Sequence, residues 1–450
     1  MKSVTSETPY ALEHFTPWIR ANDDHSDHHL ELIEQTDTLI QSGRRDARAR
    51  QLAEKLERWR YQHLHEHAAL LSPQDEALVD ALDQAANHLA GRPARPPRRT
   101  HRALSDGSWD TDSIREATEM ADERFPLASL VDRAAELTNA NFRAPSPDRP
   151  DAPTRRRMLL YAPLYVSSQC VNYCTYCGFR YPLEIERRHL SRQEAAEQTR
   201  VLRRRGFEHL LIVGGDFPRL TTTDYYRGII QDMADQGIVP AIEIAPQSTE
   251  SYAALVAAGV RGVTLYQETY DENRYGEYHR RGPKSSYHWR LESHERAAEA
   301  GIARLGLGVL LGLADPVQDV RAMMRHGAYL MDRFPGRTLA FSLPRIHEAP
   351  EGFDIAFPIS DQRLLRLYCL LRVAFPRAEL VLSTREQAEL RNRLAEICIT
   401  QMSAGSSTAP GGYDSQTHSS GEQFPVSDHR TPDEVARWLD QAGFRVVWSV

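Results

Sequence analysis

Short apolar runs alternate with amphipathic stretches from residue 158 to the end of the chain. The runs are rich in Val, Ile and Leu, which is typical of buried strands in a parallel sheet. They predict eight strands, at 158–165, 209–215, 239–245, 262–268, 304–312, 338–344, 379–384 and 396–404. The stretches between them predict helices, at 191–205, 222–236, 249–258, 287–300, 317–333, 360–374 and 386–394. This alternation predicts an α/β fold, a (βα)8 barrel of the TIM type.

The chain before residue 158 has a different pattern. Apolar residues recur at helical spacing in three stretches, 44–70, 74–90 and 111–141. Polar breaks rich in proline and arginine follow the second and third stretches, at 91–110 and 146–157. We therefore expect three parts: a helical N-terminal extension with its linker (1–110), a helical lead-in (111–157) and the barrel with a C-terminal helical region (158–450).

Composition narrows the class of protein. The 450 residues are 41% hydrophobic and 26% charged, with a formal net charge of −7, so neither a nucleic acid nor a membrane is an expected partner. No apolar run approaches the roughly 18–20 residues that span a bilayer. The first residues have no apolar core of a secretory signal peptide, and we expect a cytoplasmic protein.

Cysteine usage gives the strongest chemical signal. Three of the five cysteines, Cys170, Cys174 and Cys177, form a C-x3-C-x2-C motif directly after the first barrel strand, whereas Cys369 and Cys398 lie in apolar runs and are expected in the core. Three thiolates on one loop can hold three irons of a [4Fe–4S] cluster and leave the fourth iron open for a small molecule. A zinc site is the alternative, but it would need a fourth Cys or His nearby, and His189 is in a poor context for that.

This motif resembles that of the radical S-adenosylmethionine (SAM) superfamily. The resemblance implies that SAM binds the open iron through its amino and carboxylate groups. It also implies that an electron from a flavodoxin- or ferredoxin-type donor cleaves SAM to a 5′-deoxyadenosyl radical, which abstracts hydrogen from a small-molecule substrate. The cofactors would supply the difficult chemistry, and the protein would supply position and exclusion of water.

Further segments are similar to the aromatic amino-acid lyases of this superfamily, which include the thiamine-pathway tyrosine lyase (2-iminoacetate synthase) and the tyrosine lyase of [FeFe]-hydrogenase maturation. The segments are 162–179, 265–270, 280–302, 305–313, 382–386, 403–413 and 422–435. The resemblance implies cleavage of the Cα–Cβ bond of tyrosine to p-cresol and dehydroglycine (2-iminoacetate), which a thiazole-forming partner protein would receive. No cysteine follows Cys398, so we expect one cluster and not the second-cluster tail of the hydrogenase maturase.

Two positions depart from the pattern of these lyases. Asp216 stands where they usually have Glu, and His347 stands where they usually have a second Arg. That Arg would be a natural bidentate partner for an amino-acid carboxylate. Another amino acid therefore stays open as the substrate, as does a non-catalytic, cluster-carrying assembly protein.

The candidate site residues lie at the ends of the predicted strands, where barrel enzymes have their active sites. For cofactor binding they are Tyr176, Gly214, Gly215, Asp216, Glu243, Gln267 and Glu268. Only one of Gln267 and Glu268 can point into the barrel, because side chains alternate along a strand. For substrate and catalysis they are Arg345, His347, Arg385 and Ser403. Solvated strand ends, and a pair between Arg385 and Glu386, are the structural alternatives.

Overall fold

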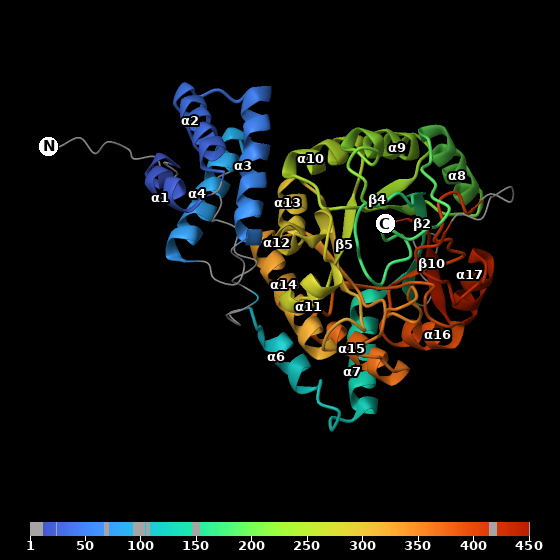
Figure 1. The fold of residues 1–450 in the computed structure, drawn as a ribbon. Helices are drawn as coiled ribbons and strands as arrows, with labels where there is room; N and C mark the ends of the chain where they lie inside the picture. The colour runs from blue at the N-terminus through green and yellow to red at the C-terminus, as the bar shows by residue number, and fades with distance from the viewer. Residues whose placement is uncertain are drawn as a thin grey trace.

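Eight parallel strands close into a barrel in the computed structural model (Figure 1). The structure describes residues 12–23, 25–66, 72–92, 104, 109–145, 154–413 and 421–449. Each barrel strand pairs with the next in chain order, and β9 pairs with β2 to complete the ring. The strands are β2 Arg155–Ser167, β3 His209–Gly214, β4 Val239–Glu243, β5 Gly262–Glu268, β6 Arg304–Val309, β7 Thr338–Ser342, β8 Glu379–Leu382 and β9 Gln401–Ser403.

The first half of β2 extends beyond the barrel. There it pairs antiparallel with β1 (Arg143–Ala144) and parallel with β10 (Phe444–Val447) near the end of the chain. The second half of β2 enters the barrel and leads directly into the cysteine motif. The extra pairs therefore anchor the strand that carries the motif.

Helices cover the outside of the barrel. They are α8 Arg192–Arg204, α9 Thr223–Asp235, α10 Thr249–Ala258, α11 Glu272–Tyr278, α12 Tyr287–Leu291, α13 Ser293–Glu299, α14 Pro316–Arg333, α15 Asp361–Ala374, α16 Ala388–Ile397 and α17 Pro432–Gln441. Side-chain oxygens of Ser191, Thr222, Ser248 and Ser360 accept backbone N–H groups at the starts of α8, α9, α10 and α15. These N-caps explain why each helix begins soon after a polar loop.

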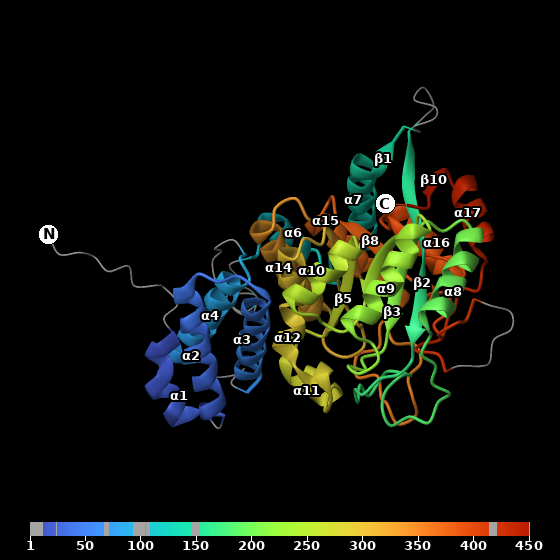
Figure 2. The ribbon, with the colours of Figure 1, turned by 90° about the horizontal axis from the view of Figure 1, so that it is seen from above.

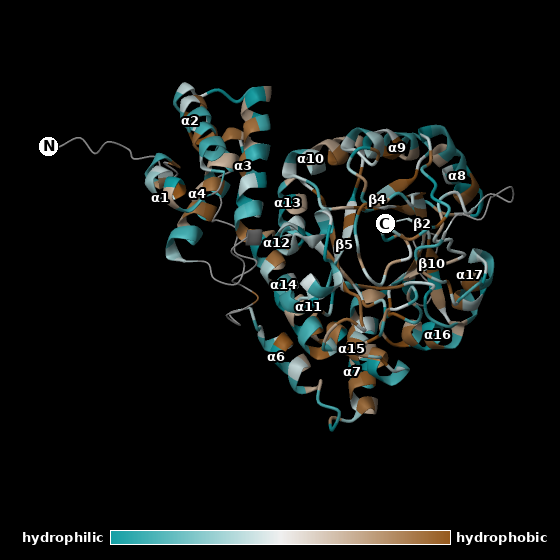
Figure 3. Ribbon diagram, viewed as in Figure 1, coloured by the Kyte–Doolittle hydropathy of each residue, from teal (hydrophilic) through white to brown (hydrophobic). Residues whose placement is uncertain are grey.

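A separate helical bundle lies beside the barrel, next to α10 and α12 (Figure 2). It consists of a 3-10 turn and four helices, η1 Leu12–Phe15, α1 Thr16–Asn22, α2 Ser26–Ser42, α3 Ala47–Glu66 and α4 Pro73–Leu89. Its own core includes Leu32, Leu52, Leu56, Leu78 and Leu82. Figure 3 shows hydrophobic residues of α2, α3 and α4 between these helices. The helices α6 (Asp112–Glu119) and α7 (Leu127–Phe142) follow and pack against α15.

The barrel and the helical N-terminal extension are confirmed. The predicted strand 396–404 is wrong in its first half, because α16 continues to Ile397 and β9 has only three residues. Leu390, Leu394 and Ile397 are buried at helical spacing, and a short apolar run fits either period. The predicted helix 287–300 divides at Glu292, and 111–141 divides before Pro126, where proline restricts the residue before it.

The division of the chain into three parts at 110 and 157 stays a prediction. Most of the two predicted polar breaks lies outside the described residues, since 93–103, 105–108 and 146–153 are not among them. Within the described part of the chain, no helix is both long and apolar enough to cross a membrane.

Close packing inside the barrel is testable at Gly308 on β6. A methyl group there would meet the ring of Tyr266 and the carbonyl of Ser342. We expect Gly308→Ala to lower the free energy of unfolding of the apoprotein by about 1–3 kcal/mol in urea titrations. Gly276→Ala is the matched control, because open space surrounds that position in α11. Equal stability of the two variants would contradict the packing described here.

Candidate active site

An open cavity lies at the carboxyl ends of β2, β3, β4 and β5, with about 660 Å³ of empty space including the solvent at its opening. All three motif cysteines line it, together with polar side chains from the three following strands and their loops. Its polar lining residues include Asn172, Asp216, Glu243, Tyr266, Glu268, Lys284, Arg290 and Gln423. The cavity therefore brings thiols and charged groups to one end of the barrel, where a cofactor and a substrate can meet.

The loop that carries the cysteines has almost no regular structure, and three other segments hold its backbone. They are the loop after β3, the loop after β5 and the segment before α17. The hydrogen bonds join Gly215 N to Ser167 O (2.9 Å), Val171 N to Asp216 O (2.9 Å), Tyr173 N to Arg281 O (3.2 Å), Thr175 N to Tyr278 O (3.1 Å) and Gly178 N to Gln423 O (3.1 Å). These contacts fix the positions of the cysteines before any ligand binds.

Two glycines at the end of β3 allow close approach: Gly215 makes room for the cysteine loop, and Gly214, the last residue of β3, makes room for α9. A side chain on Gly215 would meet the carbonyl of Gln169, and one on Gly214 would meet the hydroxyl of Tyr226. Both glycines also line the cavity. The structure thus gives them a packing reason that the sequence did not suggest.

Burial raises the pKa of the thiol of Cys174 to about 12 and raises that of Cys177 as well. The thiols are therefore protonated until an electrophilic metal displaces the protons. The backbone N–H of Phe179 donates to Cys177 Sγ (3.4 Å), and Gln423 Nε2 lies 3.8 Å from the same sulfur. Such donors favour a metal-bound thiolate and tune an iron–sulfur cluster. The donor set fits a cluster with three thiolate ligands.

The zinc alternative would need a further ligand beside the three cysteines. In the part of the chain that the structure describes, no group of three or more His, Cys, Asp or Glu side chains is arranged to hold a single metal ion. His189 instead lies beside β2, with Nδ1 3.2 Å from Ser167 Oγ.

Glu268, at the end of β5, contacts two cationic side chains in the cavity. Its Oε1 accepts from Lys284 Nζ (2.7 Å) and from Arg290 Nη2 (3.2 Å). Burial alone would raise the pKa of Glu268, but these two cations bring it below its ordinary value. Its φ of 73° is the only positive value for a non-glycine residue in the described chain, and costs of order 1–3 kcal/mol. Gln267 is buried and does not line the cavity, so only Glu268 of the pair faces it.

Asn172 links the cysteine loop to two charged residues of the cavity, Asp216 and Lys284. Its Nδ2 donates to Asp216 Oδ2 (3.0 Å), and its Oδ1 accepts from the backbone N–H of Lys284 (2.9 Å). Burial raises the pKa of Asp216, while this hydrogen bond from Asn172 opposes the rise. Asp216 therefore keeps one carboxylate oxygen for a further donor, such as an amino group.

Tyr176 lies behind the cysteine loop and not among the residues that line the cavity. Its hydroxyl is 2.8 Å from His279 Nε2, and His279 Nδ1 is 2.8 Å from the carbonyl of Tyr275. Since a carbonyl only accepts, Nδ1 carries the proton and Nε2 accepts from Tyr176. Burial, followed by the charge of Lys284, holds the pKa of His279 well below its ordinary value. This neutral pair supports the loop from outside.

Glu243 is the last residue of β4, and Arg385 lies just after β8. The positive charge of Arg385 acts on the Glu243 carboxylate. Burial raises the pKa of Glu243 to about 7, against the positive charge of Arg385, which is its strongest opposing influence. The Arg385 guanidinium stacks on Phe424, with its carbon 3.6 Å from the ring centroid. Among the described residues, Arg385 Nη1 and the buried hydroxyl of Ser406 have no hydrogen-bond partner. Neither residue lines the cavity, but both groups have hydrogen-bonding capacity left for a polar ligand.

Arg345 and His347 form a cluster around Glu386 outside the residues that line the cavity. Arg345 donates to Glu386 from Nε (3.0 Å) and Nη2 (2.5 Å), to the carbonyl of Ile359 (2.7 Å) and to Asp361 (2.5 Å). His347 Nε2 is 3.2 Å from Glu386 Oε1. Hydrogen bonds from His347 and Arg345 bring the pKa of Glu386 below its ordinary value, although burial opposes them. Arg345 and His347 therefore use hydrogen bonds on Glu386 and not on a ligand in the cavity.

Ser403 holds the backbone next to Arg385. Its hydroxyl accepts from the N–H of Thr384 (3.1 Å), and its carbonyl accepts from Arg391.

Eight of the residues expected from sequence line the cavity: Cys170, Cys174, Cys177, Gly214, Gly215, Asp216, Glu243 and Glu268. The sequence reasoning missed Asn172 and Gln423, although one lies inside the cysteine motif and the other in the 422–435 segment.

Comparisons with known proteins agree with this arrangement. Residues 164–326 match the model of the radical SAM superfamily, and residues 342–445 match that of the biotin and thiamin synthesis associated domain. The 2-iminoacetate synthase of Escherichia coli is 35% identical over 324 residues, which are 72% of this chain and 82% of the relative.

More distant relatives extend the picture. The 3-methylornithine synthase of Methanosarcina acetivorans is 29% identical over 49% of this chain and 61% of its own. A crystal structure of HydG, a maturase of the [FeFe]-hydrogenase, superposes with a TM-score of 0.66 at 30% identity and covers 78% of this chain and 80% of the maturase. The match to HydG spans most of both chains.

The raised pKa of Glu243 makes a testable contribution to stability. The folded protein binds a proton at Glu243 up to about pH 7, whereas the unfolded chain releases it near 4.5, so this group costs stability as pH rises through that window. We compare the free energy of unfolding of the Glu243→Gln apoprotein with that of the parent apoprotein. We expect this difference to shift in favour of the variant by roughly 2–3 kcal/mol between pH 5 and pH 8. Urea unfolding at pH 5 and at pH 8 measures this difference in stability. A difference that does not change with pH would exclude a raised pKa of Glu243.

Proposed function

Because this chain belongs to the radical SAM superfamily, we propose that it is a lyase which cleaves the Cα–Cβ bond of an aromatic amino acid, with tyrosine as the first candidate. The products would be p-cresol and 2-iminoacetate. The observation that carries the proposal is that Cys170, Cys174 and Cys177 line the same cavity as Glu243 and Glu268. The similarity to 2-iminoacetate synthase over most of that enzyme supports the reaction type.

The three motif cysteines would hold one [4Fe–4S] cluster, and SAM would occupy the cavity beside it. When bound, these cofactors supply a 5′-deoxyadenosyl radical that abstracts a hydrogen atom. Asp216 offers a carboxylate oxygen to the amino group of SAM, and Glu268 offers an acceptor for a ribose hydroxyl or amino group. Lys284 and Arg290 keep Glu268 ionised for this role. A flavodoxin- or ferredoxin-type protein would deliver the electron.

The substrate end would be formed by Glu243, which lines the cavity, and by Arg385, which does not line it but whose charge acts on Glu243. The buried Nη1 of Arg385 has no hydrogen-bond partner in the part of the chain that the structure describes, so it can bind the amino-acid carboxylate. Arg345 is already held by Glu386 and Asp361, and its role is to fix the neighbouring backbone. Glu243, with a pKa of about 7, can accept a proton from the substrate ammonium group. The proposed reaction would begin with abstraction of a hydrogen atom from the amino group of the substrate, and this step would require a neutral amino group.

The product assay tests the reaction directly. The full chain, reconstituted with iron and sulfide without oxygen, is incubated with SAM, dithionite and tyrosine. We expect liquid chromatography with mass spectrometry to detect 5′-deoxyadenosine and p-cresol in comparable amounts. Cys174→Ala removes a ligand of the cluster and should abolish both products, whereas Cys369→Ala, in the core, should retain them.

Different results would redirect the proposal. Formation of 5′-deoxyadenosine without p-cresol would exclude tyrosine and direct the search to other amino acids, as the similarity to 3-methylornithine synthase suggests. Absence of both products, from protein with a verified cluster, would favour a non-catalytic assembly protein. If p-cresol forms, transfer of 2-iminoacetate to a thiazole-forming partner becomes the next question.

Arg385 should determine the affinity for the amino-acid carboxylate. We expect Arg385→Gln to raise the KM for tyrosine roughly 10- to 100-fold, because a charge-assisted hydrogen bond contributes about 1.5–3 kcal/mol. Tyramine has no carboxylate, so its binding should change little in the same variant. Steady-state kinetics and competition with tyramine measure both effects. An equal loss for tyrosine and tyramine would remove Arg385 from the carboxylate site.

A further inference from the structure

The N-terminal bundle lies outside both family matches, which cover residues 164–326 and 342–445. Nevertheless its helix α3 contacts the barrel through α10 and α12 (Figure 2). Both elements adjoin segments that line the active-site cavity: α12 carries Arg290, and the loop before α10 carries Ala245 and Pro246. The contacts between α3 and these elements indicate what the bundle does.

The first contact is a buried ion pair. Arg60 on α3 makes a two-pronged pair with Glu292, which directly follows α12, and neither side chain is exposed to solvent. Two residues earlier, Arg290 donates from Nε to the carbonyl of Tyr266 (2.6 Å) and from Nη2 to Glu268 (3.2 Å). The Arg60 pair therefore fixes the end of the short helix that aims Arg290 at the cavity.

The second contact is an aromatic and cationic cluster that reaches the loop after β4. Tyr61 and Trp289 contact each other edge to face, with centroids 4.1 Å apart, and the guanidinium carbon of Arg296 lies 3.7 Å and 4.6 Å from the centroids of Trp289 and Tyr61. Arg296 also donates to the carbonyl of Gln247 (2.7 Å), and Trp289 Nε1 donates to that of Pro246 (3.3 Å). Tyr61 thus supports both the loop after β4 and α12 from outside the barrel.

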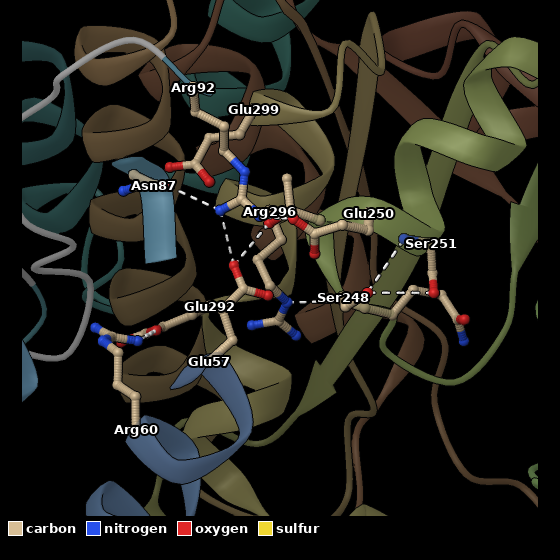
Figure 4. A network of polar contacts seen from close by, with 12 residues as sticks. Glu57, Arg60, Asn87, Arg92, Ser248, Glu250, Ser251, Glu292, Arg296 and Glu299 are labelled. Carbon is tan, nitrogen blue, oxygen red and sulfur yellow. Dashed lines mark hydrogen bonds and ion pairs between the residues drawn. The ribbon is translucent and has the colours of Figure 1, made fainter. Parts of the chain in front are cut away.

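A third contact joins α3 to the first turn of α10 (Figure 4). Glu57 accepts from the hydroxyl of Thr249 (3.1 Å) and from Arg92 Nη1 (2.9 Å), and Arg92 also pairs with Glu250. Together the three contacts join the bundle to the two segments that form one wall of the cavity. A bundle that needed only an attachment point could pack on any outer helix.

From this arrangement we propose that the N-terminal bundle is part of the cofactor site, with Arg60 and Tyr61 as positioning residues for Arg290 and the loop after β4. A helix of five residues such as α12 is not stable by itself, so its orientation depends on what packs against it. External support preorganises Arg290 and Glu268 and lowers the cost of ordering them when SAM binds. The inference rests on the radical SAM assignment and is independent of the amino-acid substrate.

The test compares Arg60→Met with Arg58→Met, the same change at an exposed position of α3. Both variants are prepared as full chains with a reconstituted cluster. The SAM dissociation constant is measured by titrating the change that SAM causes in the electron paramagnetic resonance spectrum of the reduced cluster. We expect Arg60→Met to weaken SAM binding about tenfold, the effect of one misplaced charge-assisted hydrogen bond, and Arg58→Met to have no effect.

Hydrogen exchange provides a readout that does not depend on the cofactor. In apoprotein, the amides of 244–248 and 286–292 should exchange faster in Arg60→Met than in Arg58→Met, while those of β6 and β7 stay protected. The double variant Arg60→Met/Glu292→Gln also removes the buried charge of Glu292, and should recover stability but not the SAM affinity. If Arg60→Met does not fold, Tyr61→Phe serves instead, because it removes only the oxygen that accepts from Arg296.

The outcomes separate positioning from simple attachment. Weaker SAM binding with faster exchange in the two segments supports the proposal. A lower melting temperature with SAM affinity and loop exchange unchanged in the folded protein would overturn it. Neither result depends on p-cresol formation, so failure of this inference and failure of the proposed lyase reaction are distinguishable.

Discussion

The central constraint in this structure is that a loop without regular secondary structure must present three thiols in fixed positions. Backbone hydrogen bonds from three distant segments meet this constraint, and the glycines Gly178 and Gly215 let those segments come close enough. The long strand β2 anchors the beginning of the loop, with extra pairing from β1 and β10. The rest of the site is arranged around the cysteines because the same loops that hold them also carry Asp216, Lys284 and Gln423.

The charge of the buried carboxylate in the cavity is balanced by neighbouring cationic side chains and not by solvent. Glu268 is buried in a strained backbone conformation, and it stays ionised because Lys284 and Arg290 both contact it. At Glu243 burial outweighs the charges of Arg385, Arg290 and Lys284, so its pKa rises to about 7. Two carboxylates at the ends of neighbouring strands thus acquire different protonation behaviour, which suits one to binding a cofactor and the other to accepting a proton.

The alternation of apolar runs was enough to predict the barrel, because buried parallel strands and amphipathic helices differ in both length and period. It failed at 396–404, where Ile397 fits either period. The cysteine motif and strand ends located most of the cavity, since parallel strands end on one face. Sequence could not show that Arg345 is engaged by Glu386, nor that Arg60 and Tyr61 support α12, because these contacts join residues far apart in the chain.

The most direct test of this account is whether SAM binds a cluster held by these three cysteines. Pulsed electron paramagnetic resonance of the reduced, reconstituted protein with SAM labelled with ¹⁵N at its amino group measures the coupling between that nitrogen and the cluster. The account predicts a clear ¹⁵N coupling in the parent, and no cluster signal once Cys170, Cys174 and Cys177 are replaced by alanine. A fully assembled cluster that shows no coupling to bound SAM would contradict it.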